Sequence, residues 1–527
     1  MPKPQHNESV VDIFVIGGGV NGCGVARDAA GRGLSVTLAE MGDIASATSS
    51  ASTKMFHGGL RYLEFFELGL VSKALKERET LLQAMPHISW PMRFILPYHK
   101  DMRFDSDTPT SRILQIFMPW AKGRRPAWLI RLGLFLYDIL GKREILPGTS
   151  SLDLRQSPEG AVLQSQYAKA YEYSDCWVED SRLVVLNARA AVEAGAAVLT
   201  QNKVVAAERL GGLWQITLRD QISGALSTHK ARALVNAAGP WVADLTGDTL
   251  NVVTQEKVRL VRGSHIVTKK LFDHDKGYFF QGRDGRIIFA LPYETDFTLI
   301  GTTDAAHEDA DLAPTCTPEE TAYLCKFASE FFEEPVTEQD IVWSYSGVRP
   351  LYDDGASSAT AATRDYVLSL NAPQGEAPLL TVFGGKITTY RKLAEGVLAK
   401  LGDSFPDMSG DWTAGVALPG GDFAVDGVAG LIAQLMADYS FLTGKWAQRL
   451  VRGYGTDAQK IMGNAKVVAD LGLDFGATLS EAELRWLMTH EFARSADDVL
   501  WRRTKLGLRL TAQEAARLET WMKDVSQ

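Results

Sequence analysis

Residues 11–40 read VDIFVIGGGVNGCGVARDAAGRGLSVTLAE, and this stretch decides the fold. Its first six residues, 11–16, are mostly apolar and β-branched, which predicts a buried strand. Three glycines follow in the spacing GxGxxG, residues 20–32 favour a helix, and residues 34–39 predict a second strand. A GxGxxG motif alone would also fit an ordinary loop. Between two strands and at the start of a helix it indicates a dinucleotide-binding βαβ unit.

Each residue of the motif has a physical role in that interpretation. Gly17 permits a tight turn, Gly19 lets the backbone approach a pyrophosphate, and Gly22 allows the helix to pack closely on the strand. The helix N-terminus offers unpaired N–H groups and a partial positive charge to the phosphates. Glu40 ends the second strand about 20 residues after the glycines, where a carboxylate accepts hydrogen bonds from ribose hydroxyls. The alternative is a plain βαβ turn without a ligand.

Length and composition limit the classes of protein. A chain of 527 residues is too long for one core, so we expect two or three domains. The net charge of -9 argues against nucleic-acid binding. Cys23, Cys176, Cys316 and Cys325 show no CxxC pair and no metal-ligand spacing, which predicts four ordinary thiols in a reducing compartment and no metal site. The polar start of the chain and the shortness of its charge-free runs predict neither a signal peptide nor a transmembrane helix.

The remaining chain alternates between helical and strand patterns. Helical periodicity is expected over three segments, 63–85, 182–194 and 317–332. Short strands are expected over four segments, 197–200, 204–208, 213–219 and 231–237. Residues 258–304 predict an antiparallel sheet that roofs a cofactor. Beyond 419–421 the pattern is mostly helical, and residues 497–508 carry charges on a helical face.

Three cations stand in positions that suit an anionic ligand. The segments 343–351 and 363–366 each present an arginine at a turn, Arg349 and Arg364. A doubly charged phosphate needs fixed cations, and the planar fork of arginine suits it best. The alternative is a solvated arginine or a structural ion pair. Lys386 follows two glycines before a helix, where it suits an anion or a flavin edge, or is simply a helix-start charge.

His57 and His265 are the two histidines that lie in motif-like loops. An alcohol that loses a hydride must also lose its hydroxyl proton, and imidazole is suited to accept a proton near neutral pH. Either histidine is therefore a candidate base. The alternative is a histidine that only completes local hydrogen bonds.

Residues 112–143 combine aromatic and aliphatic side chains with Lys122, Arg124, Arg125, Lys142 and Arg143. One interpretation is a buried helix over 128–140 beside a basic loop. The other is a surface that enters the lipid interface, with aromatics below and cations at anionic headgroups. The two interpretations stay open at the level of sequence.

The chain resembles the FAD-dependent glycerol-3-phosphate dehydrogenases, the respiratory enzymes that feed quinone. The resemblance runs from about residue 11 to residue 508 and is carried by long motifs: IGGGVNGCGVARDAAGRGLSV, SSASTKMFHGGLRYLE, YEYSDCWVEDSRL, LVNAAGPW, GSHIV, IGTTD, WSYSGVRPL, TRDY, FGGKITTYRKLAE and DDVLWRRTKLGL. One departure is the region 100–125, which is longer than the family pattern leads us to expect.

The resemblance implies an α/β fold: a Rossmann-like FAD-binding domain, an antiparallel β-sheet substrate domain and a C-terminal α-helical domain. The FAD-binding domain is expected in three segments, 11–90, 166–257 and 346–412. Part of the substrate domain, with a possible membrane-contact region, is expected over 91–165, its β-sheet roof over 258–345 and the helical domain over 413–527. It also implies hydride transfer from C2 of sn-glycerol 3-phosphate to non-covalently bound FAD, which gives dihydroxyacetone phosphate.

The family pattern assigns site residues by position. Catalytic roles are expected for His265, Arg349 and His57. Substrate contacts are expected for Arg61, Tyr62, His265, Arg349, Arg364, Lys386 and Thr389. FAD contacts are expected for Gly17, Gly18, Gly19, Gly22, Glu40, Ser49, Ser50, His57, Gly59, Gly239, Gly385 and Lys386.

The implied partners are a membrane quinone and an anionic lipid surface on the inner face of the cytoplasmic membrane. A homodimer and a monomer are both left open. Two other functions remain. An amine or amino-acid oxidase of the same fold would need a carboxylate clamp in place of the phosphate clamp. A flavoprotein that only binds, as a sensor or scaffold, would hold a flavin that the sugar phosphate does not bleach.

Overall fold

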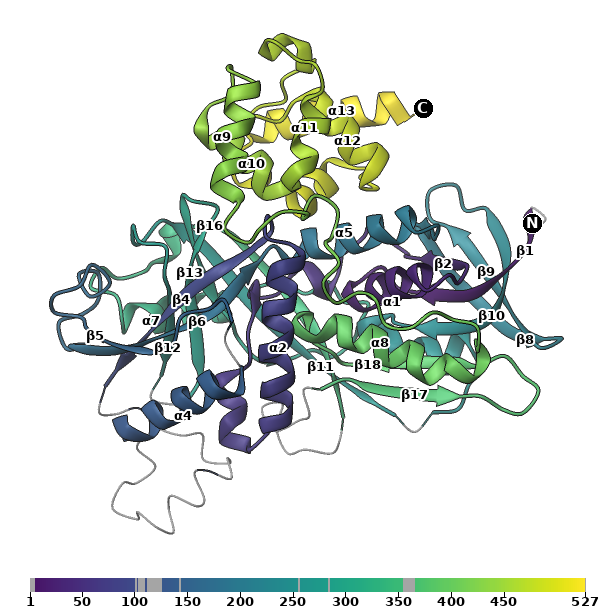
Figure 1. Ribbon diagram of the computed structural model, residues 1–527, viewed down its shortest axis with the longest axis horizontal. Helices are drawn as coiled ribbons and strands as arrows, with labels where there is room; N and C mark the ends of the chain where they lie inside the picture. The colour runs from purple at the N-terminus through teal and green to yellow at the C-terminus, as the bar shows by residue number, and fades with distance from the viewer. Residues whose placement is uncertain are drawn as a thin grey trace.

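The computed structural model describes residues 5–99, 102, 110, 126–141, 144–254, 256–282, 285–353 and 365–526. Two sheets and a helical domain form the molecule (Figure 1). The predictions for Arg364, for Lys122, Arg124, Arg125, Lys142 and Arg143, and for most of 100–125 lie outside the described residues.

The first sheet is built around β1 (Gln5–Ile16), as the opening stretch predicts. Its central strands are parallel and run in the order β18 (Leu379–Phe383), β10 (Leu226–Asn236), β1, β2 (Val36–Ala39) and β7 (Ala197–Leu199). Three antiparallel strands complete it: β17 (Val367–Asn371) beside β18, β9 (Leu213–Asp220) beside β10, and β8 (Asn202–Leu210) beside β9.

Three helices pack together on this sheet: α1 (Val20–Gly31), α5 (Asp180–Glu193) and α8 (Tyr390–Leu401). Small residues at the contact face of α1, such as Ala26 and Ala29, are fully buried and let the helices approach closely. The carboxyl ends of β1, β10 and β18 therefore meet at one edge of the sheet, where parallel α/β sheets bind ligands.

The second sheet joins segments from distant parts of the chain. Its strands are β3 (Met55–Phe56), β4 (Ser89–Tyr98), β5 (Ser150–Asp153), β6 (Lys169–Val178), β11 (Val258–Lys269), β12 (Gly277–Gln281), β13 (Ile287–Tyr293), β14 (Phe297–Gly301), β15 (Ala305–Ala306) and β16 (Ile341–Tyr352). All described pairings are antiparallel except that of β4 with β12. Helix α7 (Pro318–Ser329) begins with a capping box formed by Thr317 and Glu320 and packs on this sheet.

Two sequence predictions about helices need correction. The helix predicted over 63–85 begins only at Leu68, as α2 (Leu68–Ala84), because Leu60–Phe65 forms a 3₁₀ helix and Phe66 takes a left-handed φ of 60°. The segment 128–140 is helical, as α4 (Ala127–Leu140), but only Ile130, Leu134 and Tyr137 are buried in it. The interpretation of this segment as a buried helix is therefore wrong.

The C-terminal domain is helical, as predicted. It contains α9 (Val428–Asp438), α10 (Gly444–Tyr454), α11 (Ala458–Met462), α12 (Glu481–His490) and α13 (Ala512–Ser526) around its own apolar core. The charges of 497–508 do not form a solvent face. Arg503 is buried and donates to both carboxylate oxygens of Asp43 at 2.7 Å, which ties this domain to the first sheet.

His87 is fully buried beneath this domain, and neither ring nitrogen has a hydrogen-bond partner in the described part of the chain. Burial, with Arg182, Arg452 and Arg189 nearby, lowers its pKa from 6.5 to about 3. Between these two pH values the unfolded chain binds a proton that the folded chain does not. We expect the free energy of unfolding to decrease as pH falls from about 6.5 toward 3, measured from urea denaturation, with a shallower decrease for His87→Asn. An identical slope in both proteins would contradict this pKa.

Candidate active site

The glycine turn after β1 has the geometry that a pyrophosphate needs. Gly17 has a φ of +109°, and a Cβ there would lie 2.5 Å from the carbonyl oxygen of Ala237. A Cβ on Gly22 would lie 1.9 Å from the carbonyl oxygen of Gly17, so only glycine allows α1 to pack on the turn. Helix α1 begins after Gly19 with no side-chain cap and no acidic residue in its first turn, so its N-terminus suits an anion.

Glu40 holds the same turn from the end of β2. Its carboxylate accepts hydrogen bonds from the backbone N–H groups of Gly18 (2.6 Å) and Gly42 (2.7 Å). Burial raises the pKa of the carboxyl group, whereas these two backbone donors lower it. The predicted bond from a ribose hydroxyl to Glu40 stays a prediction.

Two other glycine-rich turns meet this one at the sheet edge. Ala237, after β10, donates its N–H to the carbonyl of Ile16 at 2.9 Å. The Asn21 amide donates to the carbonyl of Gly384, after β18, at 3.1 Å. The residues present therefore fit a dinucleotide: glycine turns from three parallel strands surround a helix N-terminus.

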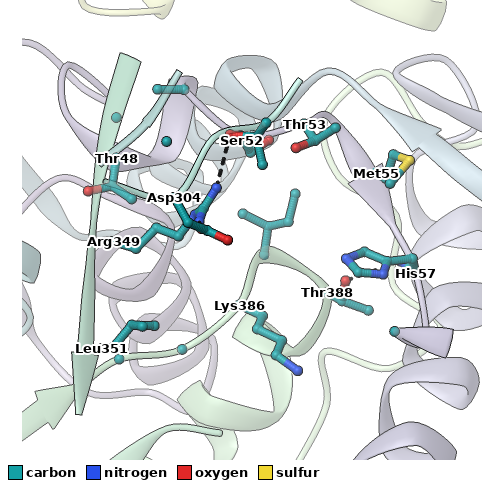
Figure 2. A pocket seen from close by; sticks show the side chains of 18 of the residues that line it. Thr48, Ser52, Thr53, Met55, His57, Asp304, Arg349, Leu351, Lys386 and Thr388 are labelled. Carbon is teal, nitrogen blue, oxygen red and sulfur yellow. Dashed lines mark hydrogen bonds and ion pairs between the residues drawn. The ribbon is translucent and has the colours of Figure 1, made fainter. Parts of the chain in front are cut away.

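A cavity of about 580 Å³ extends from this edge to the second sheet (Figure 2). Eleven of the predicted site residues line it: Gly19, Ser49, His57, Gly59, Arg61, Tyr62, Gly239, His265, Arg349, Gly385 and Lys386. Six predicted site residues lie outside its lining: Gly17, Gly18, Gly22, Glu40, Ser50 and Thr389. Thr388, the neighbour of Thr389, is in the lining, and both threonines are buried. A substrate contact of Thr389 stays a prediction.

Arg349 lies within β16 and not at a turn, which corrects the sequence prediction. Residue 348 pairs with Arg262 of β11 and residue 350 with Leu260, so the strand continues through this position. The guanidinium donates to the Asp304 carboxylate and, at 3.1 Å, to Thr302 Oγ1. Arginine has five donors, so this pairing leaves others for a ligand anion.

His265 is buried on β11 against the floor of the cavity. Its Nε2 lies 2.9 Å from Thr53 Oγ1, and its ring stacks on Tyr345 with centroids 4.8 Å apart. Burial, followed by the charges of Arg349 and Lys54, lowers its pKa well below 6.5. The imidazole is therefore neutral near pH 7, and the same surroundings disfavour the imidazolium that would form if it accepted a proton.

Two further side chains approach the cavity from other directions. Figure 2 shows His57 on one side, opposite Arg349, and Lys386 below both. The His57 backbone N–H donates to Thr388 Oγ1 at 3.3 Å. The Lys386 ammonium lies 3.8 Å from the centroid of the Tyr62 ring, a cation–π distance.

The sequence analysis missed a buried ion pair beside the cavity. Lys54 and Asp180 are both fully buried, and their Nζ and Oδ1 atoms are 2.7 Å apart. Asp180 also accepts from the backbone N–H of Ser52 at 3.0 Å and from its hydroxyl at 2.8 Å. Lys54 donates to the Ser50 carbonyl at 3.2 Å. The pair thus holds the loop that presents Ser52 and Thr53 to the cavity.

The charged and proton-accepting side chains of the cavity indicate which kind of ligand and reaction it suits. Arg349 and Lys386 provide positive charge, His57 and His265 provide proton acceptors, and the glycine edge provides a cradle for a dinucleotide. Within the described residues no group of His, Cys, Asp or Glu could hold a metal ion. The arrangement suits cofactor-dependent oxidation of a small phosphorylated alcohol.

Comparison with known proteins covers nearly the whole chain. Residues 12–391 match the FAD dependent oxidoreductase family, and residues 412–524 match the C-terminal domain of alpha-glycerophosphate oxidase. The chain is 45% identical to the aerobic glycerol-3-phosphate dehydrogenase of Escherichia coli over 98% of each chain. It is 46% identical to the glycerol-3-phosphate dehydrogenase of Pseudomonas aeruginosa, over 98% of this chain and 95% of that one.

Two other matches complete the comparison. A D-erythritol 1-phosphate dehydrogenase of Brucella abortus is 46% identical over 98% of each chain. The crystal structure of the glycerol-3-phosphate dehydrogenase from Bacillus halodurans complexed with FAD matches with a TM-score of 0.71 at 24% identity, over 98% of this chain and 94% of that one. The chain belongs to the family of FAD-dependent oxidoreductases that includes the glycerol-3-phosphate dehydrogenases.

Proposed function

We propose that this protein oxidises sn-glycerol 3-phosphate to dihydroxyacetone phosphate, with non-covalently bound FAD. The observation that carries the proposal is the meeting of Arg349, Lys386 and the two histidines around a cavity of about 580 Å³ beside the dinucleotide cradle. The names of the relatives at 45% and 46% identity support the same substrate.

Different residues of the chain bind the phosphate and accept the proton. FAD would be held by the glycine turns that follow β1, β10 and β18, and when bound it would supply the acceptor for the hydride of C2. Arg349 binds the phosphate and is itself oriented by Asp304 and Thr302. His265, neutral and 2.9 Å from Thr53 Oγ1, accepts the hydroxyl proton, with Thr53 placed to relay it. His57 is the second candidate for this role, because its position on the cavity wall needs no relay.

A second candidate substrate is D-erythritol 1-phosphate, because a relative at 46% identity carries that name. Both substrates are phosphorylated polyols and use the same cations. The two substrates differ in chain length. The free volume of the cavity next to Arg349 therefore decides which of them the enzyme binds better.

Anaerobic bleaching of the bound flavin tests the proposal. The enzyme is titrated with sn-glycerol 3-phosphate, D-erythritol 1-phosphate, glycerol, glycine and sarcosine, and flavin absorbance is followed. We expect glycerol 3-phosphate to bleach the flavin at the lowest concentration and glycerol to fail. Bleaching by glycine or sarcosine would identify an amino-acid oxidase. A flavin that none of the compounds bleaches would indicate a binding protein.

We further propose that the electrons pass to a membrane quinone while the enzyme rests on an anionic lipid surface. Five large apolar side chains of α4 are between 40% and 57% exposed: Trp128, Leu132, Phe135, Leu136 and Ile139. We call them the α4 face. Phe66 and Leu68, beside the adjoining α2, are also exposed. No described helix is long and apolar enough to cross a membrane. An exposed apolar face of this size suits insertion into the lipid interface.

The α4 face can be tested by flotation with anionic liposomes. We expect the wild type to float at low salt, and a variant with Trp128, Phe135 and Ile139 changed to serine to stay at the bottom. The matched control changes Leu210, Ile222 and Val253 to serine, three exposed apolar residues on other elements. All three proteins should reduce a soluble dye equally. Flotation of both variants would place the contact elsewhere, for example in the C-terminal domain.

The proposal also concerns where the enzyme works in the cell and how many chains it contains. The enzyme works at the inner face of the cytoplasmic membrane as a peripheral protein. A homodimer stays a prediction, to be measured by light scattering in detergent.

A further inference from the structure

A second cavity, of about 810 Å³, lies between the second sheet and the C-terminal domain. Its walls come from the start of β4, from β13 and the turn after it, from α10 and from the segment after Arg503. Figure 1 shows α10 above this end of the second sheet. The cavity is separate from the catalytic one, because the two share no lining residue.

Positive side chains dominate the lining of this interdomain cavity. Eight lysines and arginines line it, against five aspartates and glutamates. Five of the cations are neutralised by ion pairs: Arg182 with Glu491, Lys270 with Asp273, Arg449 with Glu483, Arg503 with Asp43, and Arg509 with Glu294 and Asp296. Lys445, at the rim, lies 3.8 Å from Asp296.

Arg452 and Lys505 are the two lining cations that form no ion pair within the described part of the chain. Arg452 donates weakly to the carbonyls of Pro86 (3.3 Å) and His87 (3.5 Å), and its guanidinium lies 4.2 Å from the centroid of the Trp90 ring. Lys505 donates to Ser181 Oγ at 3.1 Å and to the carbonyl of Trp501. Burial lowers the pKa of Arg452 to about 10 with no opposing contribution from a carboxylate.

An unsatisfied donor lies in the same wall. Trp446 of α10 is 9% exposed, and its buried indole N–H has no acceptor in the part of the chain that the structure describes. A buried donor without a partner costs free energy. Arg452 and Lys505 form no direct ion pair, although Asp180, Glu179 and Glu294 act on the charge of Lys505 from a greater distance, and the indole N–H has no acceptor in the described part of the chain. All three groups are donors and suit the same kind of ligand.

We propose that the interdomain cavity binds a small, doubly charged oxyanion of the phosphate-ester class, held by Arg452, Lys505 and the Trp446 indole N–H. Guanidinium, ammonium and indole N–H groups are all donors, so they suit phosphate oxygens and not a cation or an apolar ligand. The walls come from both bodies of the molecule, so the bound anion bridges α10 and β4 and fixes the C-terminal domain on the catalytic body.

Calorimetric titration of the FAD-loaded enzyme with inorganic pyrophosphate tests the proposal. We expect one molecule to bind per chain outside the catalytic cavity, so Arg349→Gln retains this binding. Arg452→Gln should weaken it at least about tenfold, as expected for the loss of a charge-assisted contact. Lys445→Gln, at the exposed rim, is the matched control and should bind within about twofold of wild type.

Two further measurements guard against a folding artefact. Trp446→Phe keeps an aromatic side chain and removes the indole N–H, so it should weaken pyrophosphate binding several-fold without lowering the melting temperature of the free protein by more than a few degrees. Pyrophosphate should raise the melting temperature of wild type but not of Arg452→Gln. Equal binding by wild type, Arg452→Gln and Trp446→Phe would overturn the proposal. So would binding that Arg349→Gln abolishes, because the anion would then occupy the catalytic cavity.

Discussion

Changing Arg349 to alanine is expected to lower kcat/KM for sn-glycerol 3-phosphate at least about tenfold, mainly through a higher KM. A charge-assisted hydrogen bond contributes about 1.5–3 kcal/mol. Removing the guanidinium also leaves the Asp304 carboxylate facing the substrate phosphate, because Arg349 is its ion-pair partner. Repulsion between these two anions adds to the lost attraction. Steady-state kinetics with a soluble dye as electron acceptor measures the effect.

Arg286 supplies the matched control for this experiment. It lines the same cavity but is exposed, and its guanidinium lies 5.3 Å from the centroid of the Tyr323 ring. Arg286→Ala should change kcat/KM by less than about threefold, since an exposed charge is largely screened. If the two variants behaved alike, or if Arg286→Ala were the more damaging, Arg349 would not be the phosphate ligand.

Changing Asp180 to alanine is expected to lower the free energy of unfolding by about 3–5 kcal/mol, because it leaves the buried Lys54 ammonium unpaired. Ser52 loses both of its hydrogen bonds to the carboxylate, so the loop that lines the cavity loses its anchor. FAD content and kcat should therefore fall together with stability. Urea denaturation, flavin absorbance per chain and dye reduction measure the three quantities.

Two controls separate the buried pair from ordinary surface charge. Asp153 and Arg155 form an ion pair whose side chains are 39% and 62% exposed, so Asp153→Ala should have little effect on stability. The double variant Lys54→Met, Asp180→Leu should be more stable than Asp180→Ala, since it buries no unpaired charge. A double variant as unstable as the single one would show that the hydrogen bonds to Ser52, and not the ammonium, decide stability.

The first βαβ unit was predictable because its signals are local. Strand, glycine turn, helix and acidic residue follow one another within 11–40, and β1, α1 and β2 form there. The Lys54–Asp180 pair had no such signal. Its partners are 126 residues apart, and each sits in a polar stretch that reads as a loop.

The residues next to Arg349 led to the wrong prediction of its secondary structure. Gly347 and Pro350 flank it, and both residues usually mark turns. In the structure β16 pairs only with β11 among the described strands, so it is an edge strand. Proline is tolerated at an edge because its missing N–H would otherwise face solvent. Arg349 lies in the cavity lining and its role there stays a prediction, but the element that carries it is a strand and not a turn.

The α4 helix was ambiguous for a different reason. Its apolar residues cover most of its circumference, which fits both a core helix and an interfacial one. Only the tertiary structure shows that α2 covers one side and leaves the α4 face open. The sequence pattern shows how apolar a helix is, but it does not show which of its faces other elements cover.

The order of strands in the first sheet has a consequence for biosynthesis. β1 lies between β2 and β10, and β10 in turn needs β18, whose last residue is Phe383. One edge of β1 can pair with β2 soon after synthesis, but its other edge waits for β10, which is made more than 200 residues later. At about 5–20 residues per second, the nascent chain carries an apolar strand with one edge unpaired for roughly 10–40 seconds. Such a chain depends on chaperone protection during translation, and slower translation or a lack of chaperones should favour aggregation over native enzyme.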